Sequence, residues 1–264
     1  MAGVGSQPAA SHHEYYSGRT AVVTAADAIG EAVVKTLLAV GAKVVALVPD
    51  IDHILDTVGS DVPEGAFCPI YVEIDNAESI LDASKAVRAQ LPPDGLHLLV
   101  NCSGGEVPAT SFSDTTLEDF DRSYAVHVRA PWLLTRELLP HLTAAKGAVV
   151  NVACQPPVHT YPPCFPYGVS KAALSHASNV GCRELASASV RLNMISPGAS
   201  AGPAGSSVAP TTVAVDQPQE VAEAVLFLGN GVAAGFITGT ELEVAGGATL
   251  QSADAAAAAA AAPS

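Results

Sequence analysis

A tyrosine and a lysine four positions apart, Tyr167 and Lys171, are the residues of this sequence best suited to perform chemistry. They lie in a segment with helical periodicity, so both side chains face the same side and can meet. A phenol titrates near ~10, and an adjacent ammonium favours the phenolate and brings that value closer to neutral pH. The pair is therefore a candidate for exchanging a proton with a substrate, although a Tyr and a Lys that merely share a helix face satisfy the same pattern.

The surrounding chain alternates between short apolar runs and stretches with helical period. The strands that we expect are Thr20–Thr24, Lys43–Val48, Ala66–Glu73, Leu96–Asn101, Ala148–Ala153, Val190–Ile195 and Glu241–Val244. Helices are expected near Ile29–Val40, Ala77–Leu91, Leu117–Ala145, Tyr167–Ala188 and Pro218–Leu228. Nearly all-apolar strands joined by helical crossovers predict a mostly parallel seven-stranded sheet with helices on both faces. The predicted fold class is α/β, doubly wound and Rossmann-like, with ligands at the carboxyl ends of the strands.

The sequence predicts a single domain over residues 18–250, flanked by two segments without a clear pattern. Residues 1–17 are small and polar without periodicity and are expected to form a disordered tail. Residues 251–264 are mostly alanine, and such a short run is not stable as an isolated helix, so we expect a second disordered tail there.

The charge balance narrows the possible partners. Twelve Lys and Arg against 26 Asp and Glu give a formal net charge of −14, which disfavours nucleic acid and anionic membrane surfaces as partners. No apolar run is long enough to span a membrane, so the expected location is cytoplasmic. The five cysteines form no C-x-x-C pair and no cluster with histidines, which argues against disulfides and a metal site.

Several motifs appear in a fixed order along the chain and give the Tyr167–Lys171 pair a context. They read L98-L-V-N-C-S-G104, F120-D-R-S-Y-A-V-H-V128, A148-V-V-N-V-A-C154, Y167-G-V-S-K171, R191-L-N-M-I-S-P-G198, E220-V-A-E-A-V-L-F-L228 and I237-T-G-T-E-L-E-V-A-G-G247. In this order the chain resembles the classical short-chain dehydrogenase/reductase family from Thr20 to Gly247. The pieces from the fourth expected strand onward are most similar to carbonyl and dicarbonyl reductases.

The resemblance implies an oxidoreductase that interconverts a carbonyl and an alcohol with NAD or NADP. Tyr167 would exchange the substrate's proton, and Lys171 would assist it and hold the nicotinamide ribose. The cofactor-binding positions implied by the resemblance are Thr24, Ile29, Gly30, Ile74, Asn101, Ser103, Gly104, Tyr167, Lys171, Pro197 and Gly198. It also implies a homodimer or homotetramer paired through the helices expected at Leu117–Ala145 and Tyr167–Ala188. The uncharged segment 199–215 favours a small neutral or apolar substrate.

Two catalytic positions depart from the family pattern. Cys154 stands where relatives hold a serine that donates a hydrogen bond to the substrate carbonyl, and a thiol is a weak donor by comparison. Cys154 is either an ordinary thiol or a nucleophile activated by Lys171. His127 replaces an asparagine that helps to hold a proton-relay water; it either maintains a relay or is a buried histidine.

The phosphate-binding turn departs furthest. Relatives read T-G-x-x-x-G-x-G after the first strand, whereas this chain reads T24-A-A-D-A-I-G30, one residue shorter and with a single glycine. Ala25 and Ala28 place methyl groups where the backbone should approach the pyrophosphate. Asp27 places a negative charge at a helix N-terminus that should receive an anion. We therefore expect NADH and NADPH to bind poorly.

The adenosine side carries no compensating residue. Val48 and Pro49 stand at the positions that select NAD and NADP in relatives, and Asp50 is expected to be a turn or helix-cap residue. Three hypotheses follow: an oxidoreductase with an impaired cofactor turn, a catalytically silent family member that acts by binding or assembly, and a cofactor-free enzyme. The last would use Tyr167 and Lys171 with Cys154 or His127 for proton transfer.

Overall fold

The computed structural model describes residues 11–102, 110–153, 165–198 and 218–247. Seven strands form one sheet in the order β3-β2-β1-β4-β5-β6-β7, and every neighbouring pair is parallel. The strands are β1 (Thr20–Thr24), β2 (Lys43–Val48), β3 (Phe67–Tyr71), β4 (Leu98–Asn101), β5 (Ala148–Val152), β6 (Arg191–Pro197) and β7 (Glu241–Val244). The predicted α/β class is confirmed, with a sheet that is wholly rather than mostly parallel.

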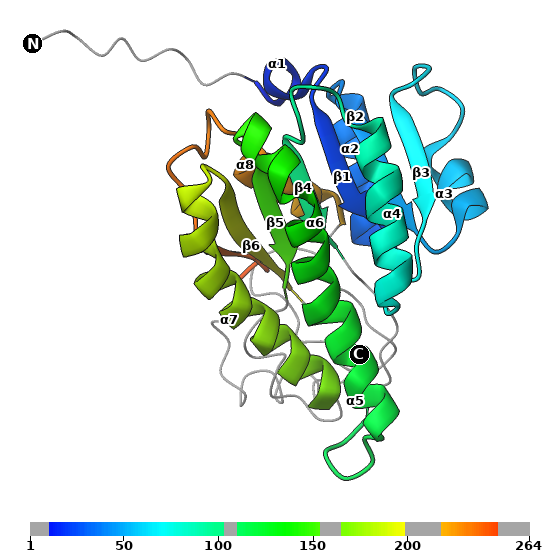
Figure 1. Ribbon diagram of the computed structural model, residues 1–264, viewed down its shortest axis with the longest axis vertical. Coiled ribbons are helices and arrows are strands. Elements are labelled where there is room, and N and C mark those ends of the chain that lie inside the picture. Colours follow the sequence, from blue (N-terminus) through cyan, green and yellow to red (C-terminus); the bar gives the residue numbers. More distant parts are fainter. Residues whose placement is uncertain (1–10, 103–109, 154–164, 199–217, 248–264) are drawn as a thin grey trace, which may run out of the picture.

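Helices cover both faces of the sheet (Figure 1). On one face α2 (Ala28–Ala39) packs against α8 (Pro218–Gly229). On the other lie α4 (Ala77–Gln90), α6 (Ala130–Ala145) and α7 (Phe165–Ser187). Shorter elements complete the described fold: α1 (His12–Tyr16), α3 (Ile51–Val58), α5 (Leu117–Tyr124) and the π-helical turn η1 (Ala125–Arg129).

The apolar strands divide their side chains between two cores. In β1, Ala21 and Val23 belong to the core under α2 and α8, whereas Val22 belongs to the core under α4 and α6. This alternation follows from the two-residue period of a strand. Because both faces are buried, nearly every position of the central strands must be apolar, which is the pattern that predicted the sheet.

Three larger differences separate the structure from the sequence-based expectation, and the other expected elements end within two residues of their observed ends. The single helix expected over Leu117–Ala145 is divided into α5, η1 and α6. The strand expected at Ala66–Glu73 is shorter, and helix α3 was not predicted. The prediction that Asp50 is a turn or cap residue is confirmed, because its carboxylate caps α3 by accepting a hydrogen bond from the His53 amide at 3.0 Å.

The N-terminal tail expected over residues 1–17 is wrong at its described end. Residues 11–17 contain helix α1, which begins with a capping box formed by Ser11 and Glu14. Tyr16 is 1% exposed, and its hydroxyl donates a hydrogen bond to the Leu226 carbonyl of α8 at 2.7 Å. A buried aromatic residue four positions before β1 therefore anchors this segment. Residues 1–10 and 248–264 lie outside the described residues.

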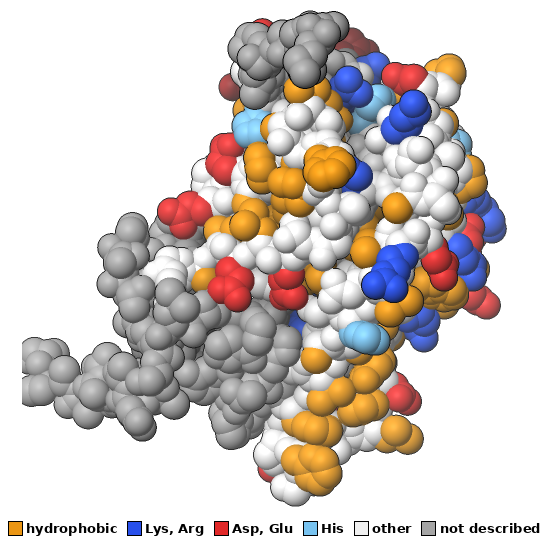
Figure 2. Space-filling view, turned by 90° about the vertical axis from the view of Figure 1, so that its left-hand side faces the viewer, with side chains coloured by type: hydrophobic (Ala, Val, Ile, Leu, Met, Phe, Trp, Pro, Cys, Tyr) orange, Lys and Arg blue, Asp and Glu red, His pale blue; other side chains and the backbone are white. Residues whose placement is uncertain are grey.

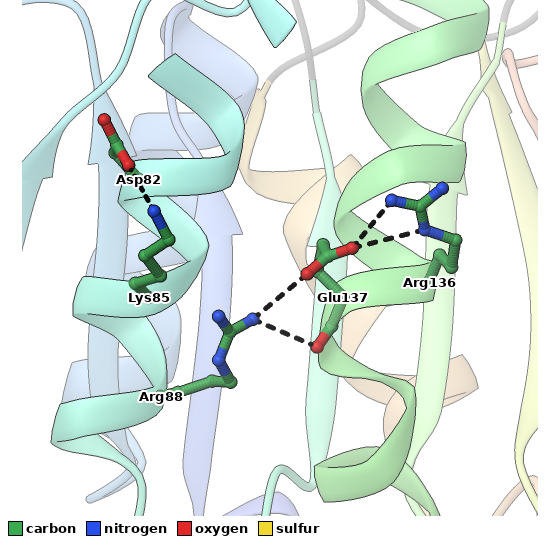
Figure 3. A network of polar contacts seen from close by, with 5 residues as sticks. All are labelled: Asp82, Lys85, Arg88, Arg136 and Glu137. Carbon is green, nitrogen blue, oxygen red and sulfur yellow. Dashed lines mark hydrogen bonds and ion pairs between the residues drawn. The ribbon is translucent and has the colours of Figure 1, made fainter. Parts of the chain in front are cut away.

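Charged side chains join α4 to α6 on the surface (Figure 3). Arg88 of α4 contacts the Glu137 carboxylate of α6 at 3.3 Å, and Arg136 donates to the same carboxylate at 2.8 Å. Hydrogen bonding by Arg136, helped by Arg88, lowers the pKa of Glu137. A second pair, Lys85 and Asp82, lies within α4 and is exposed, so it contributes little to stability.

Candidate active site

The Tyr167–Lys171 pair lies on the first turns of α7, beside the end of β5. Lys171 is 5% exposed as a residue, and its ammonium lies 5.6 Å from the centre of the Tyr167 ring and donates a hydrogen bond to the Val152 carbonyl at 3.0 Å. Burial and this bond fix the lysine, so its positive charge is held close to the phenol. The two side chains thus meet on one helix face, as their spacing indicates.

His127 is joined to this pair through a serine. Ser170 donates its single hydroxyl hydrogen to the Tyr167 carbonyl at 2.8 Å, so at 2.9 Å it accepts the hydrogen of His127 Nδ1. The imidazole then presents a bare Nε2, which is buried and has no hydrogen-bond partner among the described residues. Its ring meets the Tyr167 ring edge-on with centroids 5.1 Å apart. His127 is therefore poised to accept a hydrogen bond within the site.

Burial, with a further contribution from the Lys171 charge, lowers the pKa of His127 to about 2. The imidazole is consequently neutral at any working pH. The sequence did not single out Ser170, although its place inside Y167-G-V-S-K171, three residues after the tyrosine on the same helix, is a signal that could have been used.

The π-helical turn η1 positions His127. Between α5 and α6 the chain widens by one residue over Ala125–Arg129, and the Ala130 amide donates to the Ala125 carbonyl. Such single π turns occur often at functional sites. The residue types of this stretch are compatible with a continuous α-helix, which explains why the sequence did not predict the interruption.

The carboxyl ends of β1 and β4 meet at the point where the strand order reverses, the usual ligand position in doubly wound sheets. Thr24 ends β1, and its hydroxyl accepts a hydrogen bond from the Cys102 amide at 2.8 Å. Asn101 donates to Asn151 on β5 at 2.7 Å. Both predicted cofactor residues, Thr24 and Asn101, therefore tie strand ends together.

The remaining predicted cofactor positions are distributed along the same edge. Ile74 follows β3, Pro197 ends β6, and the Gly198 amide donates to the Val244 carbonyl at 2.9 Å. Ile29 is half-buried in the first turn of α2. Three predicted site residues lie outside the described residues: Ser103, Gly104 and Cys154.

Asp27 occupies the amide end of α2. It is the N-cap residue, and its carboxylate accepts a hydrogen bond from the Gly30 amide at 2.8 Å. The thiol of Cys102, after β4, lies 3.5 Å from the same oxygen. Burial, and then the charge of Asp27, raise the pKa of Cys102, so this thiol remains protonated. A carboxylate of the chain itself thus sits where a bound pyrophosphate would accept hydrogen bonds.

The surviving glycine of the turn has a packing role. A Cβ at Gly30 would lie 2.6 Å from the Ala25 Cα, which is closer than real Cβ contacts. Only glycine lets α2 approach the end of β1 this closely. Ala25 itself is buried, and its amide donates to the Leu47 carbonyl at 2.9 Å, so its methyl is part of the fold.

The two ends of the site differ in how well they suit a nicotinamide dinucleotide. At the nicotinamide end, Tyr167, Lys171 and Asn101 are present and lie along the same sheet edge. At the phosphate end, Asp27 takes the helix amide, and none of the salt bridges found among the described residues neutralises it. The site therefore fits the nicotinamide half, and its phosphate turn does not fit an anion.

The described part of the chain holds neither a metal site nor a membrane-spanning helix. No group of three or more His, Cys, Asp or Glu in it is placed to hold a metal ion. None of its helices has the length and apolar character needed to cross a bilayer.

Fold and site together define a doubly wound α/β protein with a tyrosine–lysine pair at the carboxyl edge of its sheet. Residues 23–249 match the family described as Enoyl-(Acyl carrier protein) reductase. Because that match covers most of the sequence, the chain belongs to the short-chain dehydrogenase/reductase family.

Characterised relatives share less than a third of their residues with the chain. It is 31% identical over 193 residues to cyclopentanol dehydrogenase of Comamonas sp., covering 68% of this chain and 76% of the relative. It is 29% identical over 255 residues to L-fucose dehydrogenase of Bos taurus, covering 89% and 91%. These relatives are named as dehydrogenases.

Solved structures agree with the fold. A 7 alpha-hydroxysteroid dehydrogenase complexed with NADH and 7-oxo glycochenodeoxycholic acid superposes with a TM-score of 0.77 at 25% identity, covering 89% of this chain and 96% of that one. A Caenorhabditis elegans short-chain dehydrogenase/reductase of unknown function, solved with cofactor, gives a TM-score of 0.82 at 21% identity, covering 92% and 99%. The second likeness bears on the fold alone.

Proposed function

We propose that this chain is an oxidoreductase that interconverts a small neutral carbonyl and its alcohol through Tyr167 and Lys171. The observation that carries the proposal is the buried Lys171 ammonium 5.6 Å from the Tyr167 ring, fixed by the Val152 carbonyl. Family membership and the dehydrogenases among its relatives support the same reaction type.

In the direction of reduction, the Tyr167 hydroxyl gives its proton to the carbonyl oxygen, and the Lys171 charge stabilises the phenolate that remains. When bound in its reduced form, NADH or NADPH, a nicotinamide nucleotide would supply the hydride to the carbonyl carbon and would be left as NAD or NADP. His127 leaves its Nε2 open as a hydrogen-bond acceptor for a group that enters the site and, through Ser170, holds the Tyr167 backbone in place. Its neutral imidazole makes it a hydrogen-bond acceptor rather than a second cation.

A second function is favoured by Asp27 alone. An enzyme that binds no dinucleotide has no need of a free helix amide end, so the Asp27 carboxylate at the start of α2 would not impair it. Such an enzyme would use Tyr167, Lys171 and His127 for proton transfer. The two functions differ in whether a nicotinamide nucleotide is needed.

Titration calorimetry with NADH and NADPH, together with carbonyl reduction assays, tests the proposed function. We expect weak binding of at least one nucleotide, with a Kd well above 10 μM on the scale of ordinary affinities, and slow reduction of neutral dicarbonyl test compounds. Tyr167→Phe should abolish the reduction, since the phenol supplies the proton. Proton exchange at the carbon next to the carbonyl group, catalysed without any nucleotide and without reduction, would favour the cofactor-free function.

We also propose a homo-oligomer paired through α6 and α7. A groove of about 410 Å³ runs between these helices, lined mainly by apolar side chains that include Leu139, Leu174 and Leu185. Trp132 of α6 also lines it and is 56% exposed. Large apolar side chains exposed on adjacent helices support a subunit contact on this face.

A further inference from the structure

The half-buried Asp27 carboxylate is fixed by its neighbours. Gly30 donates its amide to Oδ1 at 2.8 Å, and the Cys102 thiol approaches the same oxygen at 3.5 Å. Cys102 is in turn fixed by its amide, which donates to Thr24 at 2.8 Å. The carboxylate is therefore built into the junction of β1, β4 and α2 and is not a side chain free in solvent.

The amide end of a helix attracts one anion, because its first amides have no partner within the helix and the helix dipole is positive there. In this chain the carboxylate of Asp27 is that anion, because it accepts the hydrogen bond of the Gly30 amide. It does so at the β1–α2 turn, where doubly wound proteins bind pyrophosphate. A second anion at the same place would lose the Gly30 amide and would be repelled by the carboxylate at short range.

We propose that Asp27 acts as an internal anion that excludes phosphate-bearing ligands from the amide end of α2. The neighbouring charges do not cancel it. Glu31, one turn further along α2, contacts His53 at 2.8 Å, and the Asp50 carboxylate caps α3. The positive charge of Lys171 also reaches Cys102, but its effect on the pKa of that thiol is smaller than the opposite effect of Asp27. The inference concerns anion selection and holds whichever reaction Tyr167 performs.

Replacing Asp27 with asparagine distinguishes the effect of its negative charge from the effect of its N-cap hydrogen bond. Asn and Asp are about equally good N-caps, so Asp27→Asn keeps the bond to the Gly30 amide and removes the charge. Glu31→Gln removes the same charge one helical turn away and is the matched control. Asp27→Ser, which also caps a helix, serves as a second test if the asparagine variant is unstable. Thermal unfolding of each variant establishes that it is folded.

The probes are inorganic pyrophosphate and ADP, titrated calorimetrically at fixed low ionic strength. We expect Asp27→Asn to bind both at least tenfold more tightly than the unmodified chain, and Glu31→Gln to change the affinity less than threefold. Equal affinities for the unmodified chain and Asp27→Asn would overturn the inference. So would an equal gain from Glu31→Gln, because general electrostatics would then explain the effect.

Titration of the same variants with NADH separates this inference from the proposed function. A gain for pyrophosphate and ADP without NADH binding would uphold Asp27 as the excluding group and count against the oxidoreductase. A gain for all three would support both.

Discussion

At the scale of single residues, the site holds a buried cation, Lys171, next to a buried neutral imidazole, His127. Lys171 keeps its hydrogen bond to a backbone carbonyl while buried, and its charge disfavours a second cation nearby. His127 lies within the range of that charge and is 1% exposed, so both burial and repulsion act against its protonation. Its buried position next to Lys171 keeps the imidazole neutral, so it can accept a hydrogen bond.

This burial predicts an acid sensitivity. In the unfolded chain a histidine titrates near ~6.5, whereas the pKa of folded His127 is about 2. Between these values only the unfolded chain binds the proton. The free energy of unfolding therefore decreases as the pH is lowered below ~6.5, by up to about 1.4 kcal/mol per pH unit. Above ~6.5 both states are neutral and the contribution is flat. Urea unfolding between pH 5 and 8 should give a shallower acid dependence for His127→Asn.

His53→Asn is the control for that measurement. This exposed histidine is hydrogen-bonded to Glu31, which raises its pKa, so its stabilising contribution is present at low pH and is lost as pH rises through its folded pKa. Its removal should therefore not reduce the acid sensitivity. Identical acid slopes for the unmodified chain and His127→Asn would show that folding does not lower the pKa of His127.

Single residues were predictable from the sequence where a pairing rule applied. The four-residue spacing of Tyr167 and Lys171 places both on one face, and the charge of Asp27 at a helix start follows from the turn motif. The link from His127 through Ser170 was not predicted, because it joins two elements 43 residues apart and depends on the rotation of each helix. The roles of these residues in catalysis stay predictions.

At the scale of elements, the contact between β1 and α2 depends on the absence of a side chain at position 30. A Cβ there would meet backbone atoms of residues 24 and 25, which cannot move without displacing the strand. Expected strands with continuous apolar runs were located well, whereas the π turn at Ala125–Arg129 and helix α3 were not. Both are set by tertiary packing rather than by an interrupted hydrophobic pattern.

We predict that Gly30→Ala lowers the free energy of unfolding by about 1–3 kcal/mol, the usual cost of overpacking a tight contact. Gly181→Ala is the matched substitution, because that glycine lies within α7 with no atom within 4 Å of an added Cβ. It should raise stability by about 0.5–1 kcal/mol, since alanine favours a helix interior over glycine. Equilibrium urea unfolding measures both. A neutral Gly30→Ala would mean that α2 can move away from β1.

At the scale of the whole molecule, exposed apolar side chains are concentrated at one end of the described surface. Figure 2 shows hydrophobic side chains gathered in a band at the foot of the molecule, where α5 lies in Figure 1. Phe112 and Leu117 are among the most exposed large apolar residues, at 78% and 76%. The opposite end of the fold is closed by α1, whose Tyr16 reaches the last turn of α8.

That closure gives the last prediction, which concerns how much of the N-terminus belongs to the folded domain. Tyr16 is among the largest fully buried side chains, and its hydroxyl satisfies the Leu226 carbonyl near the end of α8. Nearby, Arg191 donates to the Leu228 and Gly229 carbonyls, so the end of α8 is held by side chains from two distant segments. Removing residues 1–17 should therefore lower the free energy of unfolding by about 3–5 kcal/mol, as loss of a buried aromatic does.

Removing only residues 1–10 is the control and should leave stability unchanged, because α1 and its capping box remain. Tyr16→Phe isolates the hydroxyl and should cost about 1 kcal/mol, the net value of one buried hydrogen bond. Equilibrium unfolding of the three variants distinguishes the contributions of the ring and the hydroxyl. If the chain that begins at residue 18 were as stable as the full chain, α1 would be an appendage and the domain boundary expected from the sequence would be right.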